Sequence, residues 1–243
     1  MSPHPTAELA QATDVPANTD ALQVLPVSID IVDSDQRFPV RRVYCVGRNY
    51  LAHIREMKEG DERDPPFFFQ KPSDSVVTDG RVPYPTLTDD FQFEFELVVA
   101  IGTHASNVTP EDALDHVFGY AAGLDMTRRD RQRECNKRGL PWEQGKSFDH
   151  SAPCGPIHPV AKVGHIRSGT LNLSVNGAVR QDSVLEKMIW NVHEIVSELS
   201  KQYRLLPGDL IFTGTPEGVG PVQRGDKLTG RIDGLAPLQV EIV

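Results

Sequence analysis

The first candidates for chemistry are two acids that lie two residues apart in a strand-like segment. Glu94 and Glu96 occur in FQFEFELVVAIG (residues 91–102), whose alternating start predicts that both side chains project from the same face. The solvated face of an amphipathic strand would give the same pattern. The segment then becomes wholly apolar, so the two carboxylates stand at the mouth of a buried region. They would repel each other there unless a cation lay between them.

Asp125 is the third candidate acid, because it lies in the apolar run GYAAGLDM (residues 119–126), where an ionised carboxylate is costly without a partner. Two interpretations stay open. It is a buried acid bonded to backbone amides or to Arg128 or Arg129, or it joins Glu94 and Glu96 in a metal site. Oxygen-only ligands favour Mg²⁺, Mn²⁺ or Ca²⁺ over zinc, and three of them leave about three positions on an octahedral ion for water or a chelating substrate.

His53 and Glu56 have i and i+3 spacing, which on a helix places both side chains on one face. A Glu beside a His can orient the imidazole and raise its basicity, an arrangement that activates water. A surface pair without function has the same spacing. Lys71 and Lys146 each lie close to Phe residues, and a buried Lys near a metal site would stabilise a developing oxyanion. Most lysines are simply solvated.

Other catalytic classes receive little support from the sequence. The stretch GTPEGVG (residues 214–220) lacks the GK[ST] ending of a phosphate-binding loop, and no GxSxG elbow is present for a serine nucleophile. Cys45 lies within a strand-like segment and is expected to be a small core residue. The 3 cysteines cannot all pair and form no CxxC motif, which argues against a disulfide scaffold or a zinc ribbon and favours a reducing compartment.

Short strands and a few helices are expected to position these residues. Strands are predicted at residues 42–46, 91–102, 171–175, 210–213 and 238–243, with an extended aromatic stretch at 66–72. Asn176 and Gly177 are typical of a type I′ hairpin turn after the third of these strands. Short helices are predicted at residues 50–59 and from Thr127, as the cap, to about residue 137, and another helix is predicted to start at residues 109–112. The longest helix is predicted over residues 182–203, where apolar residues recur every three or four positions.

Composition narrows the class of protein. The chain has 243 residues, and 25 Lys and Arg against 34 Asp and Glu give a net charge of −9, which argues against a nucleic-acid partner. No apolar run reaches the ~18 residues of a membrane span. The 19 Gly and 19 Pro indicate many turns rather than a helical bundle.

We expect a partly flexible arm over residues 1–36 and one catalytic domain over 37–243. The first 20 residues lack the regions of a secretory signal, which predicts a cytoplasmic protein.

Taken in order, several segments of the chain resemble the fumarylacetoacetate hydrolase family. The resemblance extends from about residue 41 to the C-terminus, and the combined order of the motifs is highly specific. The matching runs are VYCVGRNYLAHIREM (43–57), PFFFQKP (66–72), FEFELVVAIG (93–102), GYAAGLDMTRRD (119–130), WEQGKSFD (142–149), LSVNGAVRQ (173–181) and PGDLIFTGTPEGVG (207–220).

The resemblance implies an α+β, β-rich fold, a mixed β-roll with flanking helices, in a homodimer that requires Mg²⁺ or Mn²⁺, with Ca²⁺ as an alternative. By matching positions, the metal ligands would be Glu94, Glu96 and Asp125. His53 and Glu56 would activate water, and Lys146 would contact the substrate and stabilise the enolate leaving group. The implied substrate-lining residues are Arg48, Tyr50, Lys71, Arg129, Gln132 and Thr215. Arg128 departs from the family pattern, which more often has a small residue there.

The expected activity is metal-dependent hydrolysis of the C–C bond between two carbonyls of an acylpyruvate, with fumarylpyruvate of gentisate degradation as the leading substrate. Other members of the same family decarboxylate oxaloacetate or isomerise an unsaturated 2-oxo acid, and both reactions need only the shared enolate. A protein of another class, a metal-stabilised binding protein without turnover, is a more distant alternative. The HxxE pair argues against it, because such a protein has no need of a placed base.

Overall fold

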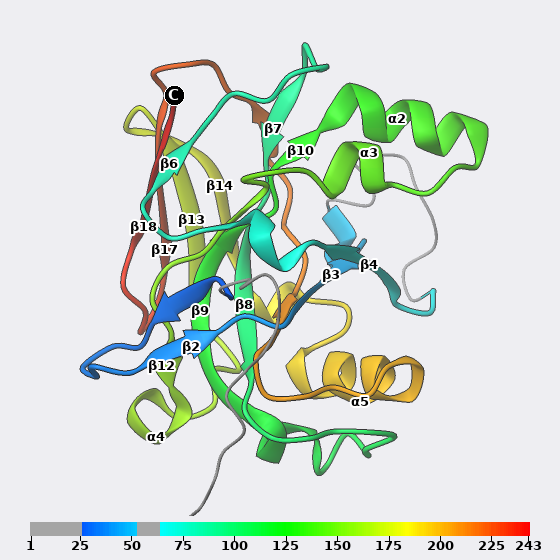
Figure 1. Ribbon diagram of the computed structural model, residues 1–243, viewed down its shortest axis with the longest axis vertical. Coiled ribbons are helices and arrows are strands. Elements are labelled where there is room, and N and C mark those ends of the chain that lie inside the picture. The colour runs from blue at the N-terminus through cyan, green and yellow to red at the C-terminus, as the bar shows by residue number, and fades with distance from the viewer. Residues whose placement is uncertain (1–25, 53–63) are drawn as a thin grey trace, which may run out of the picture.

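The protein is built around a six-stranded mixed sheet. The structure is a computed structural model that describes residues 26–52 and 64–243. The strand order is β12-β9-β8-β15-β3-β4, in which only β15 and β3 run parallel. Figure 1 shows β8 and β9 side by side near the middle of the molecule. The bounds of these strands are β3 (Arg42–Gly47), β4 (Phe67–Lys71), β8 (Phe95–Ile101), β9 (Val117–Leu124), β12 (His158–Pro159) and β15 (Asp209–Phe212).

A second, five-stranded sheet packs against the first and has the order β14-β13-β17-β18-β6. Its strands are β6 (Arg81–Val82), β13 (Thr170–Val175), β14 (Ala178–Val184), β17 (Lys227–Ile232) and β18 (Leu238–Ile242). The turn between β13 and β14 consists of Asn176 and Gly177 with φ of 51° and 81°, which confirms the predicted type I′ hairpin. Together the two sheets confirm the predicted strand-rich α+β fold.

Three small sheets complete the β structure of the described residues. One has the order β10-β7-β16, the second pairs β11 with β5, and the third pairs β1 with β2. Their strands are β1 (Ser28–Asp30), β2 (Arg37–Pro39), β5 (Val76–Val77), β7 (Phe91–Phe93), β10 (Thr127–Arg128), β11 (Ala152–Pro153) and β16 (Gly220–Pro221). The strand predicted over residues 91–102 is therefore divided at Glu94, because β7 leaves the six-stranded sheet and pairs with β10 and β16 instead.

Helices are few and short in the described part of the chain. They are α2 (Arg129–Arg138), α3 (Glu143–Lys146), α4 (Val160–Val163) and α5 (Val192–Gln202), with 3₁₀ turns at Ser73–Ser75, Ala113–His116 and Leu185–Lys187. The helix predicted from residue 109 is only the second of these turns. The helix predicted to be capped by Thr127 begins one residue later, at Arg129 with Arg128 as its cap, because Thr127 belongs to β10 and its hydroxyl donates to the Asp125 carbonyl. Most of the helix predicted over 50–59 lies outside the described residues.

The long helix predicted over residues 182–203 is wrong in its first half. The β13–β14 hairpin continues to Val184, so Asp182 and its neighbours are paired with β13, and a 3₁₀ turn follows. The true start of the helix is a capping box at Asn191. Its side chain accepts from Glu194 N at 3.3 Å, and Glu194 Oε2 accepts from Asn191 N at 3.1 Å. The helical spacing of the preceding apolar residues was coincidental, because the turn chemistry of the hairpin decides their structure.

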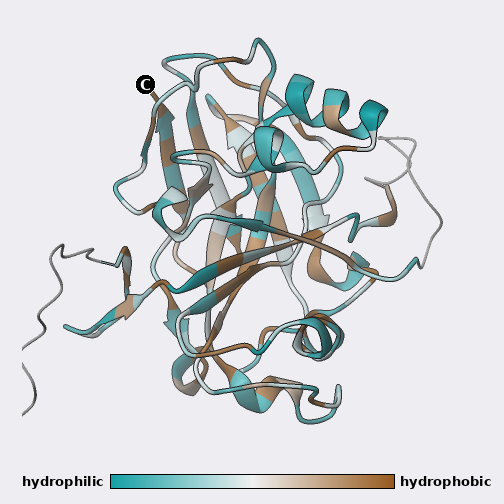
Figure 2. Cartoon of the chain, turned by 45° about the vertical axis from the view of Figure 1, so that its right-hand side comes forward, coloured by the Kyte–Doolittle hydropathy of each residue, from teal (hydrophilic) through white to brown (hydrophobic). Residues whose placement is uncertain are grey.

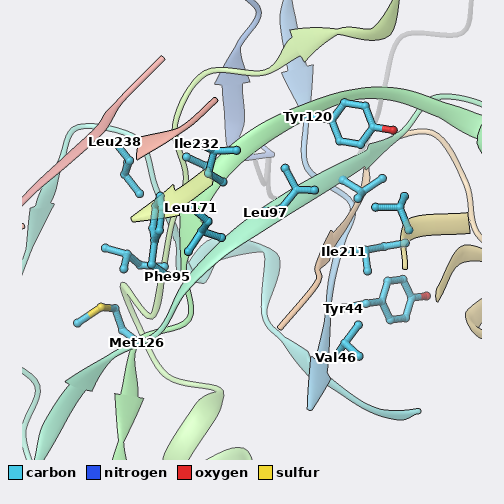
Figure 3. Packing of buried hydrophobic residues seen from close by; sticks show 14 of the residues in the cluster. Tyr44, Val46, Phe95, Leu97, Tyr120, Met126, Leu171, Ile211, Ile232 and Leu238 are labelled. Carbon is cyan, nitrogen blue, oxygen red and sulfur yellow. The ribbon is translucent and has the colours of Figure 1, made fainter. Parts of the chain in front are cut away.

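The space between the two sheets is apolar. Figure 2 shows hydrophobic colouring along the central strands and a hydrophilic α2. Figure 3 shows Phe95 of β8 on the side where Leu171 and Leu238 of the second sheet lie. The Phe95 ring packs directly on Gly230, where an added Cβ would be 2.2 Å from the ring. No helix within residues 26–52 and 64–243 is long and apolar enough to cross a membrane.

The capping box gives a test of the corrected helix start. Replacing Asn191 with Ala removes a cap and should lower the free energy of unfolding by about 1 kcal/mol, measured by urea denaturation. If the helix instead began near residue 182, Asn191 would be an interior position. The better helix propensity of Ala would then raise stability, so the sign of the change distinguishes the two structures.

Candidate metal centre

Three acids from adjoining strands meet inside the protein. Glu94 lies at the break between β7 and β8, Glu96 lies in β8, and Asp125 follows β9. The pairing of β8 with β9 brings them together, and Asp125 N donates to the Glu94 carbonyl at 2.8 Å. One carboxylate oxygen from each lies within 4.8 Å of the other two, and all three residues are at most 5% exposed. The structure thus brings together the three acids singled out from the sequence.

The residue between the glutamates explains their common direction. Side chains alternate between the two faces of a strand, so Glu94 and Glu96 point away from the face that carries Phe95. Phe95 is fully buried in the apolar space between the sheets, against Gly230. A shift of β8 by one residue would move Phe95 out of this space and the carboxylates into it, so apolar packing fixes the register of the acids.

Lys146 lies between two of the carboxylates. It ends the short helix α3, and its Nζ donates to Glu94 Oε2 at 2.7 Å, Asp125 Oδ2 at 2.8 Å and Thr127 Oγ1 at 2.7 Å. Burial alone would lower the pKa of Lys146, but the neighbouring Asp125 and Glu94 outweigh burial and raise it. The ammonium group is therefore held charged, and all three of its N–H groups are engaged by the protein.

Two further cationic side chains form ion pairs with Asp125 and Glu94. Lys71, at the end of β4, places Nζ 2.8 Å from Asp125 Oδ1 and donates to the Met126 carbonyl at 3.2 Å. Arg129, the first residue of α2, forms a buried ion pair with Glu94. Three cationic side chains thus accompany the three carboxylates, and only about 2% or less of each of these cationic side chains is exposed.

Arg129 is itself held in place by two glutamines. Its Nε donates to Gln92 Oε1 at 2.9 Å, and one Nη donates to Gln132 Oε1 at 2.5 Å. Gln132 lies one turn further along α2 and Gln92 lies in β7, so the guanidinium connects the helix to the strand that leads into Glu94. Gln92 was not singled out from the sequence, since nothing local distinguishes it from a surface glutamine.

Glu96 differs from the other two acids in its partners. Its Oε2 accepts from Gly214 N at 2.7 Å, and within the described part of the chain no cationic side chain lies within 4.0 Å of it. Burial, together with the nearby Asp125 and Glu94, raises its pKa well above the usual value. A buried carboxylate without a cation, beside two others that supply only oxygen atoms, matches the donor set that Mg²⁺ and Mn²⁺ prefer. The residues present therefore fit a divalent cation.

The remaining predicted site residues are placed differently. Thr215 is buried, and its hydroxyl donates to the Phe95 carbonyl at 2.9 Å. Tyr50 is also buried, and none of the described residues forms a hydrogen bond with its hydroxyl group. Arg48 is exposed and has a positive φ of 61°. His53 and Glu56 lie outside the described residues.

Two residues of uncertain role in the sequence also have a place in the structure. Cys45 is fully buried in β3, and burial raises the pKa of its thiol well above the usual value, as expected of a core residue rather than a nucleophile. The Arg128 guanidinium lies 4.3 Å from the centre of the Phe148 ring. Lys71 Nζ also lies 5.5 Å from that ring centre. Arg128 is thus connected to the site through the aromatic ring.

The sequence of the chain matches a known family and its members. The family described as fumarylacetoacetate (FAA) hydrolase C-terminal matches residues 42–243. A fumarylpyruvate hydrolase from a Ralstonia species is 45% identical over 177 residues, which are 72% of this chain and 92% of that protein. An Escherichia coli protein, oxaloacetate tautomerase YcgM, is 40% identical over 201 residues, which are 81% of this chain and 90% of that protein.

Solved structures of similar proteins share the fold. The crystal structure of fumarylpyruvate hydrolase from Pseudomonas aeruginosa, in complex with Mn²⁺ and pyruvate, superposes with a TM-score of 0.89 at 53% sequence identity. The match covers 91% of this chain and 97% of that one. The family match over residues 42–243 includes every strand of the two large sheets and all three acids.

Glu96 gives a direct test of the metal centre. The change Glu96→Gln keeps the shape of the side chain but removes a charge, and we expect Mn²⁺ affinity to fall by at least about 100-fold, since even groups that merely hold metal ligands typically contribute 10–100-fold. The melting temperature of the metal-free protein should not fall, because the removed charge is buried without a cation. Isothermal titration calorimetry and thermal unfolding after EDTA treatment measure the two effects. Unchanged Mn²⁺ affinity would contradict the assignment.

Removal of Lys146, unlike removal of the Glu96 charge, should destabilise the metal-free protein. Replacing it with Met leaves Glu94 and Asp125 without their shared ammonium, and breaking a buried ion pair from one side typically costs about 3–5 kcal/mol. We therefore expect a loss of that size in the metal-free protein, measured by urea denaturation. Added Mn²⁺ should restore part of it, because the ion returns positive charge to the same carboxylates. A metal-free variant as stable as the parent would show that the pair contributes nothing.

Proposed function

Because the chain belongs to the fumarylacetoacetate hydrolase family, we propose that it catalyses the metal-dependent hydrolysis of an acylpyruvate, with fumarylpyruvate as the substrate. Water adds across the C–C bond between the acyl carbonyl carbon and the CH₂ of the pyruvate part, and the products are fumarate and pyruvate. The observation that carries this proposal is the buried group of three carboxylates with Lys146 among them. It is supported by the similarity to a fumarylpyruvate hydrolase that binds Mn²⁺ and pyruvate.

The proposed ligands of the cation are Glu94, Glu96 and Asp125. When bound, a divalent cation supplies positive charge that polarises carbonyl oxygens and favours the enolate of pyruvate as a leaving group. The chain prepares this chemistry by keeping the acids close together and away from solvent, where electrostatic interactions are stronger than in water.

The charges of the site also favour a dianionic substrate. Lys71, Lys146 and Arg129 accompany the three carboxylates, so the protein groups alone are close to neutral when all are ionised. A divalent cation then adds two positive charges, which a 2-oxo acid with a second carboxylate would balance. Fumarylpyruvate and oxaloacetate both carry two carboxylates, and a neutral β-diketone does not. Charge balance therefore supports the substrate class without choosing between these two.

The chain's own residues are proposed to handle the proton and the developing charge. His53, oriented by Glu56, takes a proton from the water that attacks the acyl carbonyl. Lys146 stabilises the enolate through its charge, since its N–H groups already bind protein acceptors. Arg48 and Tyr50 stay predicted substrate contacts. The same holds for Lys71, Arg129, Gln132 and Thr215, which here bond to protein groups around the acids.

A second candidate activity is tautomerisation of oxaloacetate. It is favoured by the 40% identity with oxaloacetate tautomerase YcgM of E. coli. Decarboxylation of oxaloacetate and isomerisation of an unsaturated 2-oxo acid use the same enolate. None of these reactions consumes water, but tautomerisation and isomerisation also need a base to remove a proton from carbon. A base that activates water therefore distinguishes hydrolysis most clearly from decarboxylation, which removes no proton. The homodimer, the cytoplasmic location and the arm over residues 1–36 stay predictions.

The deciding experiment measures hydrolysis of fumarylpyruvate, and tautomerisation and decarboxylation of oxaloacetate, on the Mn²⁺-loaded parent enzyme and on a His53→Ala variant. We expect the parent to hydrolyse fumarylpyruvate with a higher kcat/KM than it shows for oxaloacetate in either reaction. His53→Ala should reduce hydrolysis by about 10²–10⁴-fold, the usual contribution of a positioned base, and should reduce any decarboxylation much less, because loss of CO₂ forms the enolate without removing a proton.

Mn²⁺ affinity measured on the same variant separates loss of the base from loss of the metal. A parent enzyme that is faster on oxaloacetate would overturn the proposed substrate. Equal losses in hydrolysis and decarboxylation would show that His53 does not act as a dedicated base for water.

A further inference from the structure

The strand that carries the glutamates is held at the site by a loop. The loop follows β15, and its Gly214 N donates to Glu96 Oε2 at 2.7 Å. The next residue, Thr215, donates its hydroxyl to the Phe95 carbonyl at 2.9 Å. Further along, β16 pairs with β7. The loop therefore takes the place of a neighbouring strand where β7 and β8 separate.

One buried side chain connects this loop to the strand. Gln181 of β14 is 0% exposed, and its Oε1 accepts from Phe95 N at 3.1 Å. Its Nε2 donates to Thr215 Oγ1 at 2.8 Å and to the Pro216 carbonyl at 2.9 Å. Both N–H groups and the carbonyl oxygen of the amide are used, so no other residue type of this size offers the same set of bonds.

A bulge in β14 aims Gln181 at the loop. The register between β13 and β14 shifts between Leu173 and Ser174, so Arg180 is an extra residue in β14 and Gln181 turns inward. The loop fits closely against this bulge. Gly218 has φ of 92°, and a Cβ there would lie 2.2 Å from the Arg180 carbonyl oxygen, so only glycine allows this approach.

We propose that Gln181 is a positioning residue for the metal centre. It does not touch the three acids. Instead, it fixes the backbone of Phe95, the residue between Glu94 and Glu96, and it fixes the loop whose Gly214 N–H holds Glu96. This inference rests on the proposed metal-dependent function, since it assigns a role to Gln181 only if the carboxylates bind a cation.

The physical reason is that a buried backbone group must keep a hydrogen-bond partner. Without the Gln181 amide, the Phe95 N–H and the Pro216 carbonyl would be left unsatisfied in the interior, which is costly. The strand and the loop would shift to recover partners. Glu96 would move with them, because its carboxylate is bonded to the same loop.

The experiment compares Mn²⁺ binding by the full-length parent, Gln181→Met and Ser183→Ala, each stripped with EDTA and titrated by calorimetry. Met fills a similar volume without an amide. Ser183 is a matched control, since it is buried two residues along the same strand and its hydroxyl has no hydrogen-bond partner among the residues that the structure describes. We expect the Mn²⁺ dissociation constant to rise about 10–100-fold in Gln181→Met and to stay unchanged in Ser183→Ala.

The outcomes separate this inference from the proposed function. If the parent does not bind Mn²⁺, the proposed metal function fails. If the parent binds Mn²⁺ and Gln181→Met binds it equally well, only the role of Gln181 is overturned. A lower melting temperature of Gln181→Met with unchanged Mn²⁺ affinity would show that Gln181 has a purely structural role. If Gln181→Met fails to fold, Gln181→Asn, which keeps the amide on a shorter chain, decides in the same way. Its Mn²⁺ affinity should fall, and parental affinity would overturn the proposal.

Discussion

The structure depends on keeping three carboxylates close together in a place that excludes water. Glu94, Glu96 and Asp125 repel one another, and each would be less costly to ionise at the surface. Folding must therefore supply positive charge and hydrogen-bond donors at the same point. Lys146 and Arg129 do this for Glu94, and Lys146 and Lys71 do it for Asp125. Glu96 receives only a backbone N–H from the described residues, which leaves it as the acid with most to gain from a bound cation.

The backbone achieves this by combining local alternation with distant contacts. Phe95 is fixed between the two sheets, and alternation then directs the glutamates to the opposite face. The strand breaks at Glu94, which frees backbone groups that a regular sheet would have paired. The loop after β15 and the amide of Gln181 bind those groups instead. Apolar packing thus sets which way the acids point, and polar contacts set how far apart they lie.

Much of the acid cluster could be predicted from the sequence, because its signals are local. Glu94 and Glu96 are two residues apart in an alternating strand, and Asp125 is an acid in an apolar run. The β13–β14 turn was equally clear from Asn176 and Gly177. The start of the longest helix could not be predicted in this way. Residues 182–189 have helical spacing of apolar residues, but part of this segment belongs to a hairpin that begins further upstream. Gln181 was missed for the same reason, because its role depends on a bulge and on a loop more than 30 residues away.

The way the acids are neutralised has a consequence for the metal. In small domains whose metal ligands are otherwise unpaired, the ion is required for folding. Here the protein provides its own cations, and the packing of two sheets does not involve the acids. The metal-free chain can therefore keep its fold, and the cation changes the charge of a site that already exists. Such a site binds its ion without having to organise the surrounding backbone. Most of the ion's positive charge is then left for an anionic substrate, because the protein carboxylates are already balanced by the lysines and the arginine.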